Sequence, residues 1–242
     1  SIKRRQVMEL ATCRFIREAR ILCRFSHPNS VTVRDFGIED DIPYMTMDFA
    51  DGQPLDEIVE RQAPLSPSMA ANLMKHALSA LAAAHEVGIV HRDLKPQNMV
   101  VEGLDSGVFR LRVLDFGIAR MMGEEHDSSW QTLTGTGVVL GTLQYMSPEQ
   151  ASGEHVDERS DVYSCGVIFY QLLTGALPFQ GDTPSEIIGK HVHQSVPRPS
   201  EVRPDLDIPD ELEDIVLKAL HKRADERYPS GREFLSALEE LF

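Results

Sequence analysis

Hydrophobic and polar positions follow two different periods along the first fifty residues. Residues 12–25 are rich in helix formers and carry apolar side chains at helical spacing, which predicts an amphipathic helix. A proline-containing turn at 26–29 ends this helix. Two strand-like runs follow at 30–36 and 42–49, on either side of an acidic turn. The beginning of the chain is therefore expected to form one helix and a pair of strands.

Helical periodicity dominates the remainder of the chain. Ser66 followed by Pro67 is the pattern of a helix start, and the amphipathic run that it opens extends over 69–87. Apolar residues alternate with two arginines over 109–113, which is the period of a half-buried strand. Further helices are expected over 162–173, over 210–221, and after Ser230, where Glu233 three residues later suggests a capping box. A small unit of helix and strands is thus followed by a larger helical one.

Composition narrows the classes of partner. The formal net charge of −14 argues against nucleic acid. The sequence has no run of 18 apolar residues, so no membrane contact is expected within this chain. The three cysteines have no metal-ligand spacing, and their odd number fits reduced thiols. We therefore expect a cytoplasmic protein, or the cytosolic part of a larger membrane-anchored one.

Two short motifs carry the candidate chemistry. The first is His-Arg-Asp-Leu-Lys-Pro-Gln-Asn at 91–98, and the second is an Asp-Phe-Gly that begins at Asp115. The Asp93 carboxylate can accept a proton from an attacking hydroxyl, and Lys95 can neutralise a γ-phosphate. Asn98 and Asp115 offer the oxygens that hold Mg²⁺ against nucleotide phosphates. The pattern predicts a phosphoryl-transfer site.

The order of these motifs and their 22-residue separation resemble the catalytic core of the protein kinases. Lys95 followed by Pro96 is similar to the Ser/Thr branch, and the Ser-Pro-Glu-Gln-Ala sequence at 147–151 is similar to its bacterial-type (Hanks-type) members. The resemblance covers essentially the whole chain and implies an α+β, protein-kinase-like fold of two lobes. Residues 1–50 would form a truncated N-terminal lobe, and 51–242 a mainly helical C-terminal lobe.

The resemblance also implies the residues around ATP. Glu18 would pair with a strand lysine that positions the α- and β-phosphates. Met47 would be the gatekeeper behind the adenine. The Asp48 carbonyl and the Ala50 backbone would bond the adenine edge, and Val100 would pack on its ring.

A regulatory set is implied between the second motif and the Ser-Pro-Glu sequence. Thr134 and Thr136 resemble the paired threonines that bacterial receptor-type kinases phosphorylate on themselves. A phosphate there would dock on Arg92 and order the loop. Thr142 lies where the threonine of the family bonds the catalytic aspartate and lysine.

Other family positions are implied to be structural. Asp161 would brace the backbone of the catalytic loop, and Glu149 would form a buried ion pair with Arg227. His191 and His193 lie two residues apart on a helical stretch and face different directions, so we expect surface histidines rather than a metal site.

The sequence departs from the family at its beginning. No glycine-rich loop precedes the first helix, and Lys3 lies closer to Glu18 than the strand lysine of the family does. The strands at 30–36 and 42–49 are therefore expected to keep an unpaired edge and an uncovered apolar face. Three explanations stay open: a fragment of a longer kinase, a scaffold without catalysis, or a chain completed by strands of a partner.

The motifs and the resemblance together predict a protein serine/threonine kinase that uses ATP and Mg²⁺, with Mn²⁺ as an alternative metal. A protein is the expected substrate, and self-association of two copies would allow autophosphorylation. The alternatives are a pseudokinase scaffold or inactive kinase fragment, and a small-molecule phosphotransferase. The last shares the spacing from Asp93 to Asn98, but it usually lacks the Ser-Pro-Glu sequence and the threonine-rich loop.

Overall fold

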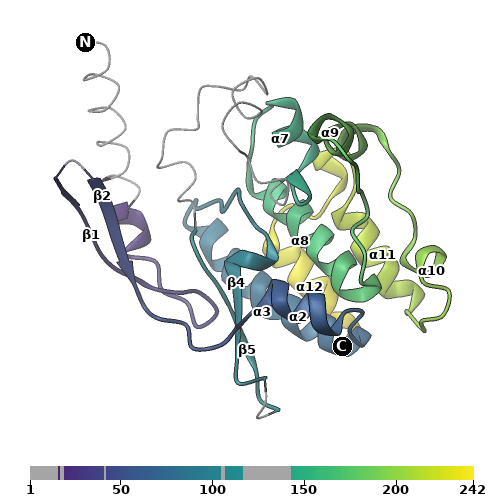
Figure 1. Ribbon diagram of the computed structural model, residues 1–242, viewed down its shortest axis with the longest axis horizontal. Helices are drawn as coiled ribbons and strands as arrows, with labels where there is room; N and C mark the ends of the chain where they lie inside the picture. Colours follow the sequence, from purple (N-terminus) through teal and green to yellow (C-terminus); the bar gives the residue numbers. More distant parts are fainter. Residues whose placement is uncertain (1–15, 17–18, 41, 105–106, 117–142) are drawn as a thin grey trace.

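The computed structural model describes residues 16, 19–40, 42–104, 107–116 and 143–242. Most of its helices gather in one body, and a two-stranded hairpin lies beside that body (Figure 1). Strands and helices are both substantial, so the predicted α+β class is confirmed.

The elements have the following bounds. The strands are β1 Val33–Glu39, β2 Ile42–Met47, β3 Gln53–Pro54, β4 Met99–Glu102 and β5 Arg110–Val113. The α-helices are α2 Leu55–Gln62, α3 Pro67–Glu86, α7 Pro148–Ser152, α8 Glu158–Thr174, α9 Pro184–His193, α10 Pro199–Val202, α11 Asp210–Ala219 and α12 Gly231–Leu241. The 3-10 segments are η1 Pro96–Asn98 and η3 Ala224–Glu226. Residues 19–22 are helical as well, within the helix predicted over 12–25.

Helix α3 begins where the sequence predicts. The Ser66 hydroxyl accepts a hydrogen bond from the Met69 N–H at 3.3 Å, and Pro67 stands at the first helical position, where its missing N–H costs nothing. One face of α3 is buried against α8, α12 and β5. These contacts make α3 the central helix of the body.

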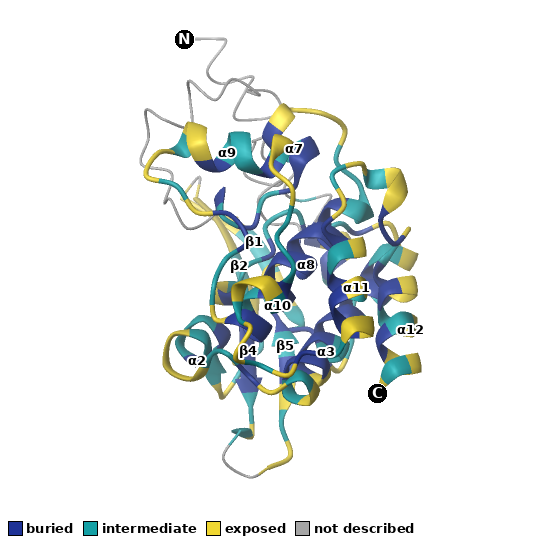
Figure 2. Ribbon diagram, turned by 90° about the vertical axis from the view of Figure 1, so that its right-hand side faces the viewer, coloured by how far each residue is buried: buried dark blue, intermediate teal, exposed yellow. Residues whose placement is uncertain are grey.

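Helix α8 runs through the interior, where Figure 2 shows it almost entirely buried. Asp157 caps its start by accepting from the Arg159 N–H at 3.0 Å. An added Cβ at Gly166 would lie 3.0 Å from the Ala219 side chain and 3.1 Å from Leu220. Glycine therefore permits the close approach of α8 and α11.

Strands β3, β4 and β5 form an antiparallel sheet in that order. Strand β5 packs on α3 and leads directly to Asp115. Gly52, just before β3, approaches the Val101 carbonyl so closely that a Cβ there would collide with it. The sheet thus places both sequence motifs next to the central helix.

Strands β1 and β2 pair with each other, with a register irregularity between Val33 and Asp35. The strand predicted over 30–36 begins later, since Ser30 instead makes a parallel bridge to Val113. Ile42 is 67% exposed, and Ile38 and Tyr44 are exposed too. These side chains face solvent, whereas Val33, Phe36 and Met45 of the same hairpin pack against the core.

Two local expectations differ from the structure. His191 is fully buried rather than on the surface, because α9 packs it against Phe179 and Tyr163. At Ser230 the hydroxyl donates to the Glu233 carboxylate at 2.6 Å, whereas a reciprocal capping box is found at Ser147 of α7. None of the helices in the described ranges combines the length and apolarity needed to cross a membrane.

Candidate active site

One buried carboxylate holds the backbone of the loop at 91–98. Asp161 accepts from the His91 N–H at 2.7 Å and from the Arg92 N–H at 2.8 Å. Its Oδ2 also lies 3.0 Å from His85 Nε2. The Gly231 N–H donates to the other nitrogen of His85, so Nε2 carries the hydrogen that Asp161 accepts. Asp161 therefore supports the backbone of the loop at 91–98, as predicted.

The charge of Asp161 is maintained by these bonds. Burial by itself would raise the pKa of the carboxyl, but the hydrogen bonds from the His85 ring and from the His91 backbone hold this pKa below its usual range. The side chain is 1% exposed, so it acts as a fixed anion inside the protein.

Replacing Asp161 by asparagine should therefore destabilise the fold. The amide offers one acceptor oxygen, and its NH₂ group would face a hydrogen-bond donor. A buried donor left unpaired costs about 1–3 kcal/mol, and we expect a loss of that size in the free energy of unfolding measured with urea. Asp182→Asn, at an exposed position, is the matched control. Unchanged stability of Asp161→Asn would contradict the bracing role.

The backbone is strained at both motifs. Arg92 has φ +69° and Asp115 has φ +56°, in the left-handed region that residues with a side chain rarely adopt. Such a conformation costs about 1–3 kcal/mol and persists where the surroundings enforce it, often at functional sites. Asp40, in the turn between β1 and β2, is the third such non-glycine residue in the part of the chain that the structure describes.

The polar side chains of the first motif converge. Lys95 Nζ lies 2.8 Å from Asp93 Oδ2. Asn98 Nδ2 donates to the Asp93 carbonyl at 2.8 Å and approaches its carboxylate at 3.4 Å. Asp93 and Lys95 keep 29% and 20% of their side chains exposed, so an incoming molecule can reach them. The structure thus brings together the three residues predicted to be catalytic.

The second motif is joined to the first through the backbone. The Leu114 N–H donates to the Asn98 carbonyl at 2.8 Å, which places Asp115 beside η1. A carboxylate and an amide oxygen are the hard ligands that Mg²⁺ accepts, with phosphates and water in its other positions. The described residues contain no group of three or more His, Cys, Asp or Glu side chains that could hold a metal without a nucleotide. Asn98 and Asp115 therefore fit a Mg²⁺ bound together with nucleotide phosphates.

The ring of His91 ties the two motifs together. Its Nε2 lies 2.7 Å from the Leu114 carbonyl, and its Nδ1 accepts from the Asp93 N–H at 3.4 Å. Only Nε2 can then carry the hydrogen. The buried ring also lies 5.1 Å from that of Phe116. His91 thereby sets the spacing between Asp93 and the end of β5.

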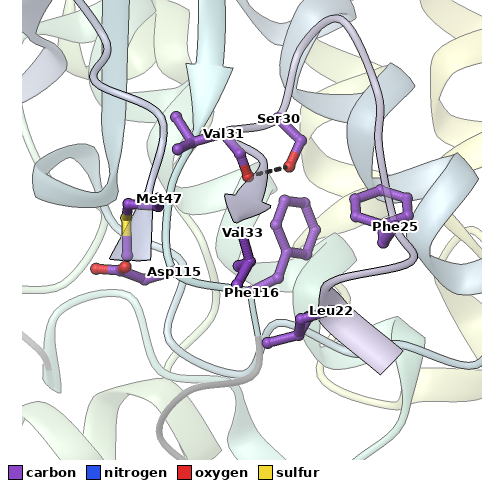
Figure 3. Close-up of a pocket in the computed structure, with 8 residues that line it drawn as sticks. All are labelled: Leu22, Phe25, Ser30, Val31, Val33, Met47, Asp115 and Phe116. Atoms are coloured by element: carbon purple, nitrogen blue, oxygen red, sulfur yellow. Dashed lines mark hydrogen bonds between the residues drawn. The ribbon is translucent and has the colours of Figure 1, made fainter. Parts of the chain in front are cut away.

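A pocket opens beside Asp115 (Figure 3). Residues from the end of the first helix, from β1 and β2, and from the second motif line it: Leu22, Phe25, Ser30, Val31, Val33, Met47, Asp115 and Phe116. Met47, predicted to be the gatekeeper, is 38% exposed and shares this pocket with Asp115. The Asp48 N–H donates to the Thr32 carbonyl at 3.0 Å, and the Asp48 carboxylate pairs with Arg34. Val100 lies in β4 and is buried.

The turn at 26–29 is fastened to β5, which sequence reasoning missed. Asn29 Nδ2 donates to the Leu111 carbonyl at 2.8 Å, and the Val113 N–H donates to the Asn29 carbonyl at 2.8 Å. The Val31 N–H returns a bond to Val113 at 3.0 Å. The His-Pro-Asn sequence signals a turn, but nothing local indicates these partners more than 80 residues away.

Several predicted residues cannot be compared with the structure. Glu18, Thr134, Thr136 and Thr142 lie outside the described residues, as does Lys3.

Comparison with known proteins identifies relatives of this chain. Residues 1–237 match the family model described as "Protein kinase domain". The serine/threonine-protein kinase pkn3 of Myxococcus xanthus is 42% identical over 96% of this chain, and PknB of Mycolicibacterium smegmatis is 41% identical over 93%. The match covers 42% of pkn3 and 35% of PknB, so the chain spans less than half the length of these curated relatives.

A solved structure is similar as well. The crystal structure of Rad53 1-466 in complex with AMP-PNP superposes with a TM-score of 0.73 at 26% sequence identity. The superposition covers 93% of this chain and 54% of that one.

Proposed function

This chain belongs to the protein kinase domain family, and from that premise we propose that it transfers the γ-phosphate of ATP to a serine or threonine hydroxyl of a protein. One observation carries the proposal. Lys95 Nζ and Asn98 Nδ2 lie 2.8 Å and 3.4 Å from the same oxygen, Asp93 Oδ2, and Asp115 follows Leu114, whose N–H donates to the Asn98 carbonyl.

Each of these side chains has a role in the proposed reaction. Asp93 orients the attacking hydroxyl and accepts its proton, since its carboxylate is partly exposed and a hydroxyl can reach it. Lys95, held 2.8 Å from that carboxylate, steadies the transferred phosphoryl group. When Mg²⁺ is bound, it neutralises charge on the phosphates, and Asn98 and Asp115 would hold it.

The nucleotide site is part of the same proposal. Met47 and Asp115 line one pocket, which favours placing the adenine near the end of β2 and the phosphates near Asp115. Asp48 and Ala50 would bond the adenine through their backbones, Val100 would pack on its ring, and Glu18 would position the phosphates. The lobe boundary near residue 50 and a cytosolic location, where ATP is available, belong to the proposal too.

Regulation by phosphorylation is the last part of the proposed function. We infer that Thr134 and Thr136 accept phosphate from a second copy of the chain and that Arg92 receives the charged group. Thr142 would bond Asp93 and Lys95. The support is the family resemblance together with charge, because a phosphate adds negative charge that a guanidinium such as that of Arg92 can pair with.

The test is transfer of labelled phosphate from ATP to a generic protein substrate, followed by phosphoamino-acid analysis. We expect phosphoserine or phosphothreonine in the presence of Mg²⁺ and no label after EDTA removes the metal. Mg²⁺-dependent ATP binding without transfer would support a pseudokinase scaffold instead. Label on an aminoglycoside or choline alone would support a small-molecule phosphotransferase.

A further inference from the structure

The peptide group directly before Asp93 is held at both of its polar ends. Its carbonyl, that of Arg92, accepts a hydrogen bond from Gln150 Nε2 at 2.6 Å. Its N–H, that of Asp93, donates to His91 Nδ1 at 3.4 Å. Because this peptide leads to the Cα of Asp93, its orientation sets the direction of the Asp93 carboxylate.

The other end of the Gln150 amide is also engaged. Its Oε1 accepts from the Ser147 N–H at 3.1 Å, while the Gln150 N–H donates to the Ser147 hydroxyl at 3.3 Å. These bonds assign the two amide atoms, since a flipped amide would put oxygen against the Arg92 carbonyl and NH₂ against the Ser147 N–H. The side-chain amide of Gln150 therefore caps α7 and also forms a hydrogen bond with the catalytic loop.

The support beneath Gln150 is rigid. Its neighbour Glu149 makes two bonds of 2.8 Å to the Arg227 guanidinium, and the Ser160 hydroxyl donates to Glu149 at 2.6 Å. Both charged side chains are buried. Helix α7 is thus fixed to the interior, and Gln150 extends from a base that cannot readily shift.

We propose that Gln150 is a positioning residue for phosphoryl transfer, which acts by holding the Arg92 carbonyl and thereby the strained backbone that aims Asp93. The inference rests on the proposed kinase function. Arg92 has φ +69°, and its N–H is held by Asp161 while its carbonyl is held by Gln150. Asp161 restrains the N–H side of the residue only, so without Gln150 the following peptide is left with the longer, 3.4 Å bond from the Asp93 N–H to His91 Nδ1 and can change its orientation more easily.

Gln150→Glu is the decisive variant. A glutamate keeps the length of the side chain and an oxygen for the Ser147 N–H, so the capping box is retained. It loses the NH₂ group and places a carboxylate oxygen against the Arg92 carbonyl. We expect kcat to fall about 10- to 100-fold, as for a catalytic group displaced by a fraction of an ångström to an ångström. KM for ATP should stay within about twofold of the wild type, because Gln150 touches none of the predicted nucleotide residues.

Two companion variants separate positioning from stability. Gln150→Leu removes both bonds, so it should lower the melting temperature as well as kcat. Gln194→Glu makes the same chemical change at an exposed position at the end of α9 and should behave as the wild type in both measurements.

The outcomes are distinct when all proteins are compared as full chains in one assay. A fall in kcat of Gln150→Glu in protein that is fully folded at the assay temperature, with an unchanged KM, supports the positioning role. A kcat of Gln150→Glu equal to that of the wild type overturns it, as does a loss of activity that only follows a loss of folded protein. If the wild-type chain transfers no phosphate, the proposed function fails and this inference fails with it.

Discussion

Replacing Asp93 by asparagine should lower kcat for phosphoryl transfer by about 10²- to 10⁴-fold, the usual contribution of a general base. Asparagine has nearly the same size as aspartate, and its amide oxygen can still contact Lys95, now 2.8 Å from Asp93 Oδ2. It cannot accept the proton of the attacking hydroxyl. The Asn98 bond to the Asp93 backbone carbonyl is unaffected by the change, so the loop should keep its conformation. Steady-state kinetics with a peptide substrate, together with thermal unfolding, would measure both effects.

The matched control is Asp207→Asn, at an exposed position outside both motifs, which should leave kcat unchanged. If Asp93→Asn were as active as the wild type, Asp93 would not be the base. If it were inactive because it is unfolded, the far-UV spectrum would reveal that, and Asp93→Glu would then serve as the test of carboxylate position.

Replacing Arg227 by methionine should destabilise the fold by about 3–5 kcal/mol, the range for removing one partner of a buried ion pair. The guanidinium has no exposed surface and donates to both oxygens of Glu149 at 2.8 Å. It also donates to three backbone carbonyls, those of Arg159, His221 and Lys222. The variant therefore leaves the buried Glu149 carboxylate without its cation and removes a donor from three carbonyls. Urea unfolding measures the loss.

The loss of unfolding free energy in Arg227→Met should depend on pH. Burial alone would raise the pKa of Glu149, but the hydrogen bonds and charge of Arg227 and the Ser160 hydroxyl hold it below its ordinary value. The stabilisation is thus present above that ordinary value and lost as pH falls through the lower pKa of the folded state. Consequently, the difference in unfolding free energy between wild type and Arg227→Met should shrink on acidification.

Arg223→Met provides the comparison for this second prediction. Arg223 pairs with Asp225 on the surface, where water screens the interaction, so its loss should change the free energy of unfolding little. Equal stabilities of Arg227→Met and Arg223→Met would show that the buried pair has no structural importance.

The sequence by itself indicated the family of the chain and much of its local structure. The two motifs named Asp93, Lys95, Asn98 and Asp115, and the resemblance that they carry to the protein kinases was confirmed by the family match and the structural superposition. The start of α3 could be predicted because a cap such as Ser66 acts within its own first turn. Periodicity likewise indicated α8, α11 and α12, since the buried face of a helix consists of apolar residues spaced three and four positions apart.

Tertiary structure alone decided the contacts between segments that are distant in the sequence. Three sets of contacts join residues that are 28 to 84 positions apart. They are the contact of buried His191 with Tyr163, the hydrogen bonds of Asn29 with β5, and the hydrogen bond of Gln150 with Arg92. Each depends on how closely two elements pack, and periodicity within one element does not specify that distance. The family pattern anticipated Asp161 and the pair of Glu149 with Arg227, but nothing in the sequence indicated what Gln150 contacts. Its partner is a backbone carbonyl, which every residue possesses, so only the folded arrangement of α7 against the loop could reveal it.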